Sequence, residues 1–292
     1  MLNWTINAAS STKLDKTMNA SVKELLPNIL GGFVVALLTV LYLKACNRLG
    51  RFHLNRVLGT VLKTDSPLVI AYGKFVLPPL VVNGERIIHS YRKQPRPSGA
   101  VSLKGTFSIE NPVSESDVRA STYLARLFGQ VKLKDVRLVS DFVAVQSNEG
   151  NFVALGGPGS NYKMTDILAC ASNIFIEMEH EYFVLKSGER LPYEATPEHD
   201  YGFILRIRSP FFPSRSLIAC AGLGEWSTSG AAWFLSRKWT ELMKLGDSWR
   251  TIWGFRRQPD FLAIVKVIRG QDDSASLVAY YRTKKGQPEK IL

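Results

Sequence analysis

The sequence predicts a three-layer α/β domain that follows a single transmembrane helix. From Ser66 onward, short apolar segments of strand length alternate with longer segments of helical periodicity. This pattern is typical of an α/β fold with a mostly parallel sheet and antiparallel additions. Ahead of it, residues 29–43 read ILGGFVVALLTVLYL, without a charged residue. The chain has 292 residues, of which 46% are hydrophobic, so it can build a full core.

We expect four parts along the chain. They are a polar N-terminal segment over 1–24, a transmembrane helix over 25–46, a basic connector over 47–65 and a ligand-binding domain over 66–292.

The apolar run has the length of a membrane span. A helix over residues 25–46 is about 33 Å long at ~1.5 Å per residue, which matches a hydrocarbon core of ~30 Å. A cleaved signal peptide needs a short basic lead, whereas residues 1–28 are long and mostly polar. A lipoprotein signal is disfavoured because Lys44 lies just ahead of Cys46. A buried core helix stays an alternative, although the run is apolar on every face.

The flanks and the cysteines predict the topology. The number of lysines and arginines is nearly balanced between the two flanks, but Arg48, Arg51 and Arg56 follow the span closely, and basic residues favour the cytoplasmic side. The three cysteines are widely spaced and odd in number, which favours a reducing compartment over a disulfide framework. We therefore expect a single-pass protein of the cell inner membrane with a cytoplasmic C-terminal domain.

The elements of the domain are expected to alternate. We predict strands over 68–73, 136–141, 151–155, 182–186, 201–208, 216–222, 261–269 and 276–283, and helices over 114–128, 161–174 and 227–245. The strands 182–186 and 201–208 are expected to pair as a hairpin.

Two glycine-rich loops form the candidate ligand site. Each lies between a predicted strand and a predicted helix, so both are expected at the carboxyl edge of the sheet, where open α/β folds bind ligands. Glycine lets the backbone approach a phosphate, and the following helix points free N–H groups at it. The candidate ligand-binding residues are Gly156, Gly157, Pro158, Gly159, Ser160, Asn161, Gly222, Gly224, Ser227, Thr228 and Ser229, together with Gly73 and Lys74 after the first strand. Helix capping by the polar side chains, and a surface position for Lys74, are the alternatives.

A family resemblance rests on these loops. LGGPGSNYKMTDIL and DYGFILRIRSPFFPSRSLIACAGLGEWSTSGAAWFL, within residues 66–245, resemble Rossmann-like nucleotide-sensing domains of the SLOG type, in the sirtuin- and TIR-associated variant of bacterial conflict systems. The resemblance implies a Rossmann-like fold that binds a nucleotide-derived signal made during phage infection. It also implies an effector, here the membrane helix, that acts on the bilayer after self-association. Glu225 departs from the pattern, because an acidic side chain beside a phosphate is unfavourable unless it binds ribose hydroxyls or faces away from the ligand.

The net charge of the chain indicates which classes of partner it can bind. The formal net charge of +12 favours anionic partners. Lysine and arginine are spread along the chain without a recognised nucleic-acid motif, so we do not expect nucleic acid. The expected partners are the lipid bilayer, an anionic nucleotide ligand and further copies of the chain. No cofactor is expected beyond such a nucleotide, and the scattered histidines give no metal site.

Two other functions stay open. A membrane-tethered enzyme could cleave a nucleoside or NAD-type glycosidic bond, with Glu225 or Asp141 as the candidate catalytic acids. The sequence shows no Ser-His-Asp or Cys-His arrangement, so it favours a binding protein over an enzyme. In a structural interaction module, the glycine loops would be turns only.

Overall fold

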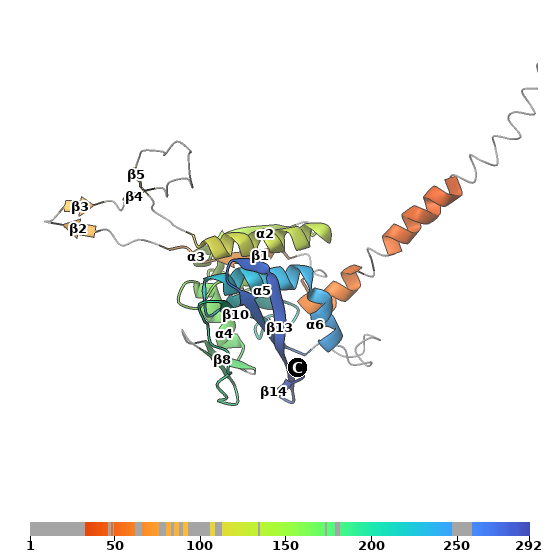
Figure 1. Ribbon diagram of the computed structural model, residues 1–292. Helices are drawn as coiled ribbons and strands as arrows, with labels where there is room; N and C mark the ends of the chain where they lie inside the picture. Colours follow the sequence, from red (N-terminus) through yellow and green to blue (C-terminus); the bar gives the residue numbers. More distant parts are fainter. Residues whose placement is uncertain are drawn as a thin grey trace, which may run out of the picture. The chain divides into compact units, whose positions relative to one another are not determined.

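The computed structural model describes residues 33–45, 48, 50–61, 66–75, 80–82, 85–87, 90–92, 106–108, 113–133, 135–172, 174–178, 182–246 and 259–292 (Figure 1). The polar segment 1–24, the first part of the predicted span and Cys46 lie outside these residues. The chain divides into two units, Met1–Gly50 and Arg51–Leu292.

The second unit is a mixed α/β domain. Its strands are β1 (Leu68–Tyr72), β2 (Leu80–Val82), β3 (Glu85–Ile87), β4 (Ser90–Arg92), β5 (Thr106–Ser108), β6 (Val136–Ser140), β7 (Asn151–Leu155), β8 (Phe175–Met178), β9 (Phe183–Leu185), β10 (His199–Arg208), β11 (Ser216–Gly222), β12 (Phe261–Ile268), β13 (Gln271–Lys284) and β14 (Gln287–Lys290). The helices are α2 (Glu115–Gln130), α3 (Asp141–Ala144), α4 (Tyr162–Cys170), α5 (Glu225–Arg237) and α6 (Trp239–Gly246).

One sheet of eight strands organises the domain. Its order is β14-β13-β12-β10-β11-β7-β1-β6. The half β6-β1-β7-β11 is parallel, and from β10 onward each strand runs antiparallel to its neighbour. The predicted α/β class is confirmed, and the antiparallel part is larger than the additions that the sequence predicted. The described residues also form three separate two-stranded sheets, β2-β3, β4-β5 and β8-β9.

Two hydrophobic cores lie on the two faces of this sheet. On one face α2 and α5 pack against each other, as Figure 1 shows, and share a core with α6. On the other face α4 packs with β8 and β9. The central strands β7 and β11 are buried along almost their whole length, because helices cover both faces.

The connector helix contributes to the first core. Leu54, Val57, Leu58 and Val61 are at most 2% exposed and belong to the cluster around α2 and α5. The compact unit therefore begins at Arg51, earlier than the predicted domain start at Ser66. The apolar positions of residues 51–61 repeat at helical spacing, so this segment buries one face in the domain.

One apolar helix is long enough to cross a membrane. Among the described residues, Phe33–Leu58 is the helix whose length and composition allow this. The side chains from Phe33 to Leu43 are exposed, as expected for a helix that is apolar on every face and not buried in the domain.

Three local predictions were wrong. The strand at 183–185 pairs with β8 and not with β10, whose neighbours are β11 and β12. The helix predicted over 227–245 is two helices, because the backbone at Lys238 leaves the helical region and its ammonium group donates to Ala275 O at 3.1 Å. The helix predicted over 161–174 ends at Cys170, and β8 follows it.

Leu58→Ala tests the connector's place in the core. We expect the free energy of unfolding of the detergent-solubilised full chain to fall by about 3 kcal/mol, since a fully buried leucine leaves a cavity. Phe52→Ala, at a position 46% exposed on the same helix, serves as the control and should change it by less than about 0.5 kcal/mol. Equal, small effects of both substitutions in chemical denaturation would show that the connector does not pack on the domain.

Candidate functional site

The candidate residues gather at one edge of the sheet. Strands β6, β1, β7 and β11 are parallel neighbours, so their carboxyl ends meet there. The loops and first helical turns at these strand ends contain Asp141, Gly73–Lys74, Gly156–Asn161 and Gly222–Ser229. β10 is antiparallel to them, so its first residues lie at the same edge. The chain leaves β7 for α4 on one face and leaves β1 and β11 for the opposite face.

The first glycine loop is held by its own side chains. Gly156 has φ of +84°, and a Cβ there would lie 3.2 Å from Asp117 Oδ1, so glycine suits this turn. Asn161 caps α4 by accepting from Met164 N at 3.1 Å. Its amide donates to Ala71 O and Leu155 O at 2.9 and 2.8 Å. Ser160 Oγ donates to Gly157 O at 3.0 Å. Asn161 therefore connects β1 and β7 to the start of α4. Its side chain caps the helix, which is the alternative to ligand binding that the sequence left open.

A buried carboxylate occupies the first turn of α4. Asp141 is 3% exposed, and its two oxygens accept from Lys74 N at 3.2 Å and from Tyr162 N at 3.0 Å. The carboxylate thus accepts from Tyr162 N, one of the backbone N–H groups that we expected to bind a ligand. The dipole of α4 also stabilises the negative charge of Asp141.

The second loop is built in the same way. Asp200 at the start of β10 is fully buried and accepts from Trp226 N in the first turn of α5 at 2.9 Å. Arg269 Nε donates to its other oxygen at 2.9 Å. A Cβ at Gly224 would lie 2.3 Å from Asp200 Oδ1, so glycine is needed for the carboxylate to fit under the helix. Ser227 bonds back to Gly224 as a cap.

A polar network joins α2, α5 and β13 beside this loop. Asp272 accepts from Ser229 Oγ at 2.6 Å, from Arg119 Nε at 3.1 Å and from Tyr123 OH at 2.9 Å. The Arg119 guanidinium lies 4.0 Å from the centre of the Trp226 ring. Thr228 is buried inside α5. Ser229 thus fixes the packing of α2 on α5.

Asp117, which the sequence analysis did not nominate, is the titratable group most affected by its position at this edge. It is 3% exposed, and its Oδ2 accepts from Gly73 N at 3.1 Å. Its pKa is raised from 3.8 to about 6, chiefly by burial; the Gly73 hydrogen bond opposes this shift and the charge of Asp141 adds to it. The hydroxyl of the adjacent Ser116 is also buried and has no hydrogen-bond partner among the described residues.

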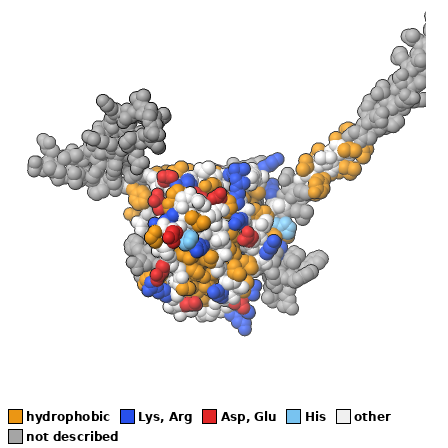
Figure 2. All heavy atoms as spheres, in the orientation of Figure 1, with side chains coloured by type: hydrophobic (Ala, Val, Ile, Leu, Met, Phe, Trp, Pro, Cys, Tyr) orange, Lys and Arg blue, Asp and Glu red, His pale blue; other side chains and the backbone are white. Residues whose placement is uncertain are grey.

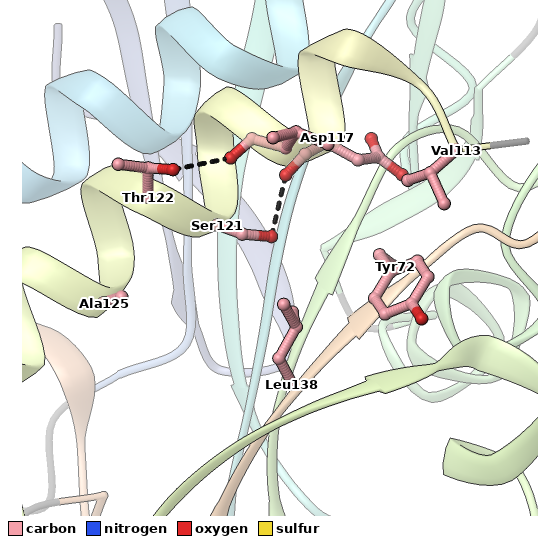
Figure 3. A pocket seen from close by; sticks show the side chains of 8 residues that line it. Tyr72, Val113, Asp117, Ser121, Thr122, Ala125 and Leu138 are labelled. Carbon is pink, nitrogen blue, oxygen red and sulfur yellow. Dashed lines mark hydrogen bonds between the residues drawn. The ribbon is translucent and has the colours of Figure 1, made fainter.

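An apolar groove opens next to Asp117 (Figure 3). Its volume is about 360 Å³, within the range of small-molecule sites. Tyr72 at the end of β1, Leu138 of β6 and Val118 of α2 contribute most of its large side chains. The hydroxyls of Ser121 and Thr122 donate to the preceding turn of α2, so both oxygens remain able to accept from a ligand.

The two predicted catalytic acids differ in setting. Glu225 is exposed in the first turn of α5, where a negative charge favours the helix dipole. Both oxygens of Asp141 are bonded to backbone N–H groups, which leaves it poorly placed to transfer a proton. Among the described residues, no three His, Cys, Asp or Glu side chains converge so that they could hold a metal ion.

Comparison with known proteins adds no family assignment. No protein-family model matches the chain, and no curated protein is significantly similar to it.

The sequence analysis missed Asp117, Asp200 and Tyr72. Asp117 lies in the polar start of the helix predicted over 114–128, and nothing local distinguishes it from Glu115 there. The signal for Asp200 was present, because a charged residue directly precedes the apolar strand YGFILRIR. Its partner lies in α5, and sequence spacing does not reveal that contact.

Asp117→Asn tests whether the fold raises the pKa of this carboxyl. Because the folded pKa is raised, the folded state binds more protons than the unfolded state between pH 3.8 and about 6, so stability falls as pH rises through that window. Between pH 4.5 and pH 7.5, the free energy of unfolding of the variant should therefore rise by about 2 kcal/mol relative to that of the wild type. Chemical denaturation at both pH values measures this. The exposed Asp273→Asn is the control, and an equal response of both variants would contradict the assignment.

Asp200→Ala tests the internal cap of α5. The change leaves Trp226 N without its acceptor and Arg269 without its partner, so we expect a loss of about 2–3 kcal/mol in the free energy of unfolding. Asp200→Asn keeps an acceptor and should lose less. Glu198→Ala, exposed and two residues away, should change stability by less than about 0.5 kcal/mol. Denaturation midpoints that match for Asp200→Ala and Glu198→Ala would rule out the cap.

Proposed function

We propose that the protein is a membrane-anchored sensor whose domain binds a nucleotide-derived molecule at the carboxyl edge of its sheet. The observation that carries this proposal is the groove of about 360 Å³ beside Asp117, at the end of β1. The groove lies between α2, the end of β1 and β6. It is next to the point where the chain leaves β1 for α2 on one face and leaves β7 for α4 on the other. Open α/β sheets bind ligands at such switch points.

The geometry favours contact with the nucleoside part of the ligand. The first turns of α4 and α5 are bonded to Asp141 and Asp200, so a phosphate does not find those N–H groups free. The groove instead offers an aromatic ring at Tyr72 and apolar side chains that suit a planar base. Asp117 lines the groove, and its carboxylate suits ribose hydroxyls. Lys74 follows β1 and is exposed at the same edge, so its ammonium group is available to the anionic part of the ligand.

The membrane half of the proposal rests on the apolar helix and on the resemblance to SLOG-type sensors. In that family a Rossmann-like domain binds a signal made during infection and switches on a linked effector. Applied here, ligand binding promotes self-association, and the associated helices act on the membrane in anti-phage defence. Self-association is required, because one helix cannot line a pore.

The second candidate is an enzyme that cleaves a nucleoside or NAD-type glycosidic bond. One observation favours it: Asp117, with a pKa of about 6 beside a groove, has the properties of a general acid near neutral pH. Asp117 takes the place of Asp141 and Glu225 as the candidate acid in this alternative.

Ligand-induced stabilisation tests the sensor. Cyclic nucleotides, ADP-ribose and NAD are titrated into the solubilised full chain, and thermal unfolding is followed at pH 7.5. A ligand at a hundred times its Kd should stabilise the fold by about 2.7 kcal/mol. Tyr72→Ala should weaken binding about tenfold. Tyr162→Ala, which removes a ring 66% exposed on α4, is the matched control and should not.

Chromatography of the same mixtures separates the two candidates. Ligand recovered intact supports the sensor, and turnover that is lost in Asp117→Asn supports the enzyme. The absence of any shift with all of these compounds, in a chain that unfolds cooperatively, would refute nucleotide binding.

A further inference from the structure

The edge of the sheet opposite the candidate site has a loop that the proposed sensor does not use. Ser209–Arg215 joins β10 to β11, and we call it the Phe loop. Phe211 is 68% exposed and Phe212 is 37% exposed, next to each other. Adjacent exposed phenylalanines on a surface loop mark a site of interaction with an apolar partner.

The Phe loop is stiff, so it holds these rings outward. Ser209 N donates to Arg215 O at 3.0 Å, and Arg215 N donates to Phe212 O at 2.8 Å. Ser209 Oγ accepts from Phe212 N at 3.2 Å. Pro210 and Pro213 restrict the backbone further. The rings are therefore displayed by a closed loop, and little conformational entropy is lost when they are buried.

Two arginines flank the rings without acidic partners. Arg208 and Arg215 form no ion pair among the described residues, and Arg208 Nε is buried without a hydrogen bond. The nearby Asp260 accepts from the Arg208 backbone N–H at 3.1 Å and lies close to the buried Arg206. Figure 2 shows a further group of Lys and Arg side chains near the end of α2. Arg126 of α2 is exposed. Unpaired cations beside exposed phenylalanines match the chemistry of an anionic lipid surface.

The path of the chain brings this loop within reach of a membrane. From Ala45, the last described residue of the apolar run, to Arg51 the chain can extend no more than roughly 20 Å. The connector helix then ends at the turn of Gly59 and Thr60. Thr60 N donates to Ser216 Oγ at 3.0 Å, and Ser216 directly follows the Phe loop. The connector helix, which the tether joins at Arg51, therefore ends beside the Phe loop.

We propose that the Phe loop docks on the anionic leaflet of the membrane in which the apolar helix is anchored. Phe211 and Phe212 enter the headgroup and acyl boundary, while Arg208 and Arg215 bind lipid phosphates. The short tether raises the effective concentration of the lipid surface at the loop, so a pair of rings suffices. This inference rests on the membrane anchorage in the proposed function and is independent of ligand binding.

Spin-label accessibility in nanodiscs tests the docking. The full chain with Cys46→Ala and Cys170→Ala receives a label through Phe211→Cys; Cys220 is buried, and burial raises its thiol pKa to about 12, so it does not react. The control label is placed through Phe142→Cys, at a phenylalanine 64% exposed on the carboxyl edge. In nanodiscs with phosphatidylglycerol, the label at 211 should gain oxygen accessibility and lose access to a water-soluble nickel chelate by roughly fivefold. The label at 142 should stay accessible to water.

A charge variant completes the test. In Arg208→Gln/Arg215→Gln, or in nanodiscs of phosphatidylcholine alone, the label at 211 should become as accessible to water as the label at 142, while the melting temperature stays unchanged. Equal accessibility of the two labels in both lipids would overturn the proposal. So would protection at 211 that persists in detergent and depends on protein concentration, because that identifies a second copy as the partner. Alkaline extraction of native membranes shows separately whether the chain is anchored, and nucleotide titration shows whether the sensor fails.

Discussion

The fold depends on carboxylates buried at the amino ends of helices. Every strand-to-helix turn at the edge of a parallel sheet leaves backbone N–H groups without intrahelical acceptors. Asp141 satisfies this need at α4, and Asp200 satisfies it at α5. Each carboxylate also ties its helix to another element, since Asp141 bonds to the backbone after β1 and Asp200 pairs with Arg269 after β12. The protein therefore supplies its own anions at the places where related architectures bind a phosphate.

This arrangement changes how a ligand can be recognised. An external phosphate at α4 or α5 would have to displace a fully bonded carboxylate, with the cost of leaving that charge buried and unpaired. Asp117 is different, because it receives a single backbone hydrogen bond and is repelled by Asp141, so its charge is poorly compensated. A ligand hydroxyl that bonds to Asp117 would relieve that deficit. The least satisfied carboxyl of the edge is thus the one that gains most from a ligand.

The sequence predicts the framework well and the site less well. Strand and helix periodicity located β1, α2, β6, β7 and β11, and it placed both glycine loops at one edge, because these features are local. It failed for the partner of β9 and for the break at Lys238, which depend on contacts with β8 and with Ala275. The sequence also does not show that Gly224 leaves room for the carboxylate of Asp200, since the two residues are far apart in the chain. A glycine next to a helix start indicates a close approach, but the sequence does not say whether a ligand or the protein itself approaches.

Charged side chains are distributed unevenly between the two edges of the sheet. Asp117, Asp141, Asp200 and Asp272 are buried at the carboxyl edge, whereas Arg206, Arg208 and Arg215 lie at the opposite edge, where the connector enters. At the carboxyl edge Asp272 pairs with Arg119 and Asp200 pairs with Arg269, so Asp117 and Asp141 are the buried carboxylates there without an ion pair among the described residues. If the Phe loop docks as proposed, an anionic leaflet attracts the edge that holds Arg208 and Arg215, over a range of about one Debye length, ~8 Å at physiological salt. In that orientation the groove beside Asp117, which lies toward the other edge of the sheet, faces away from the leaflet.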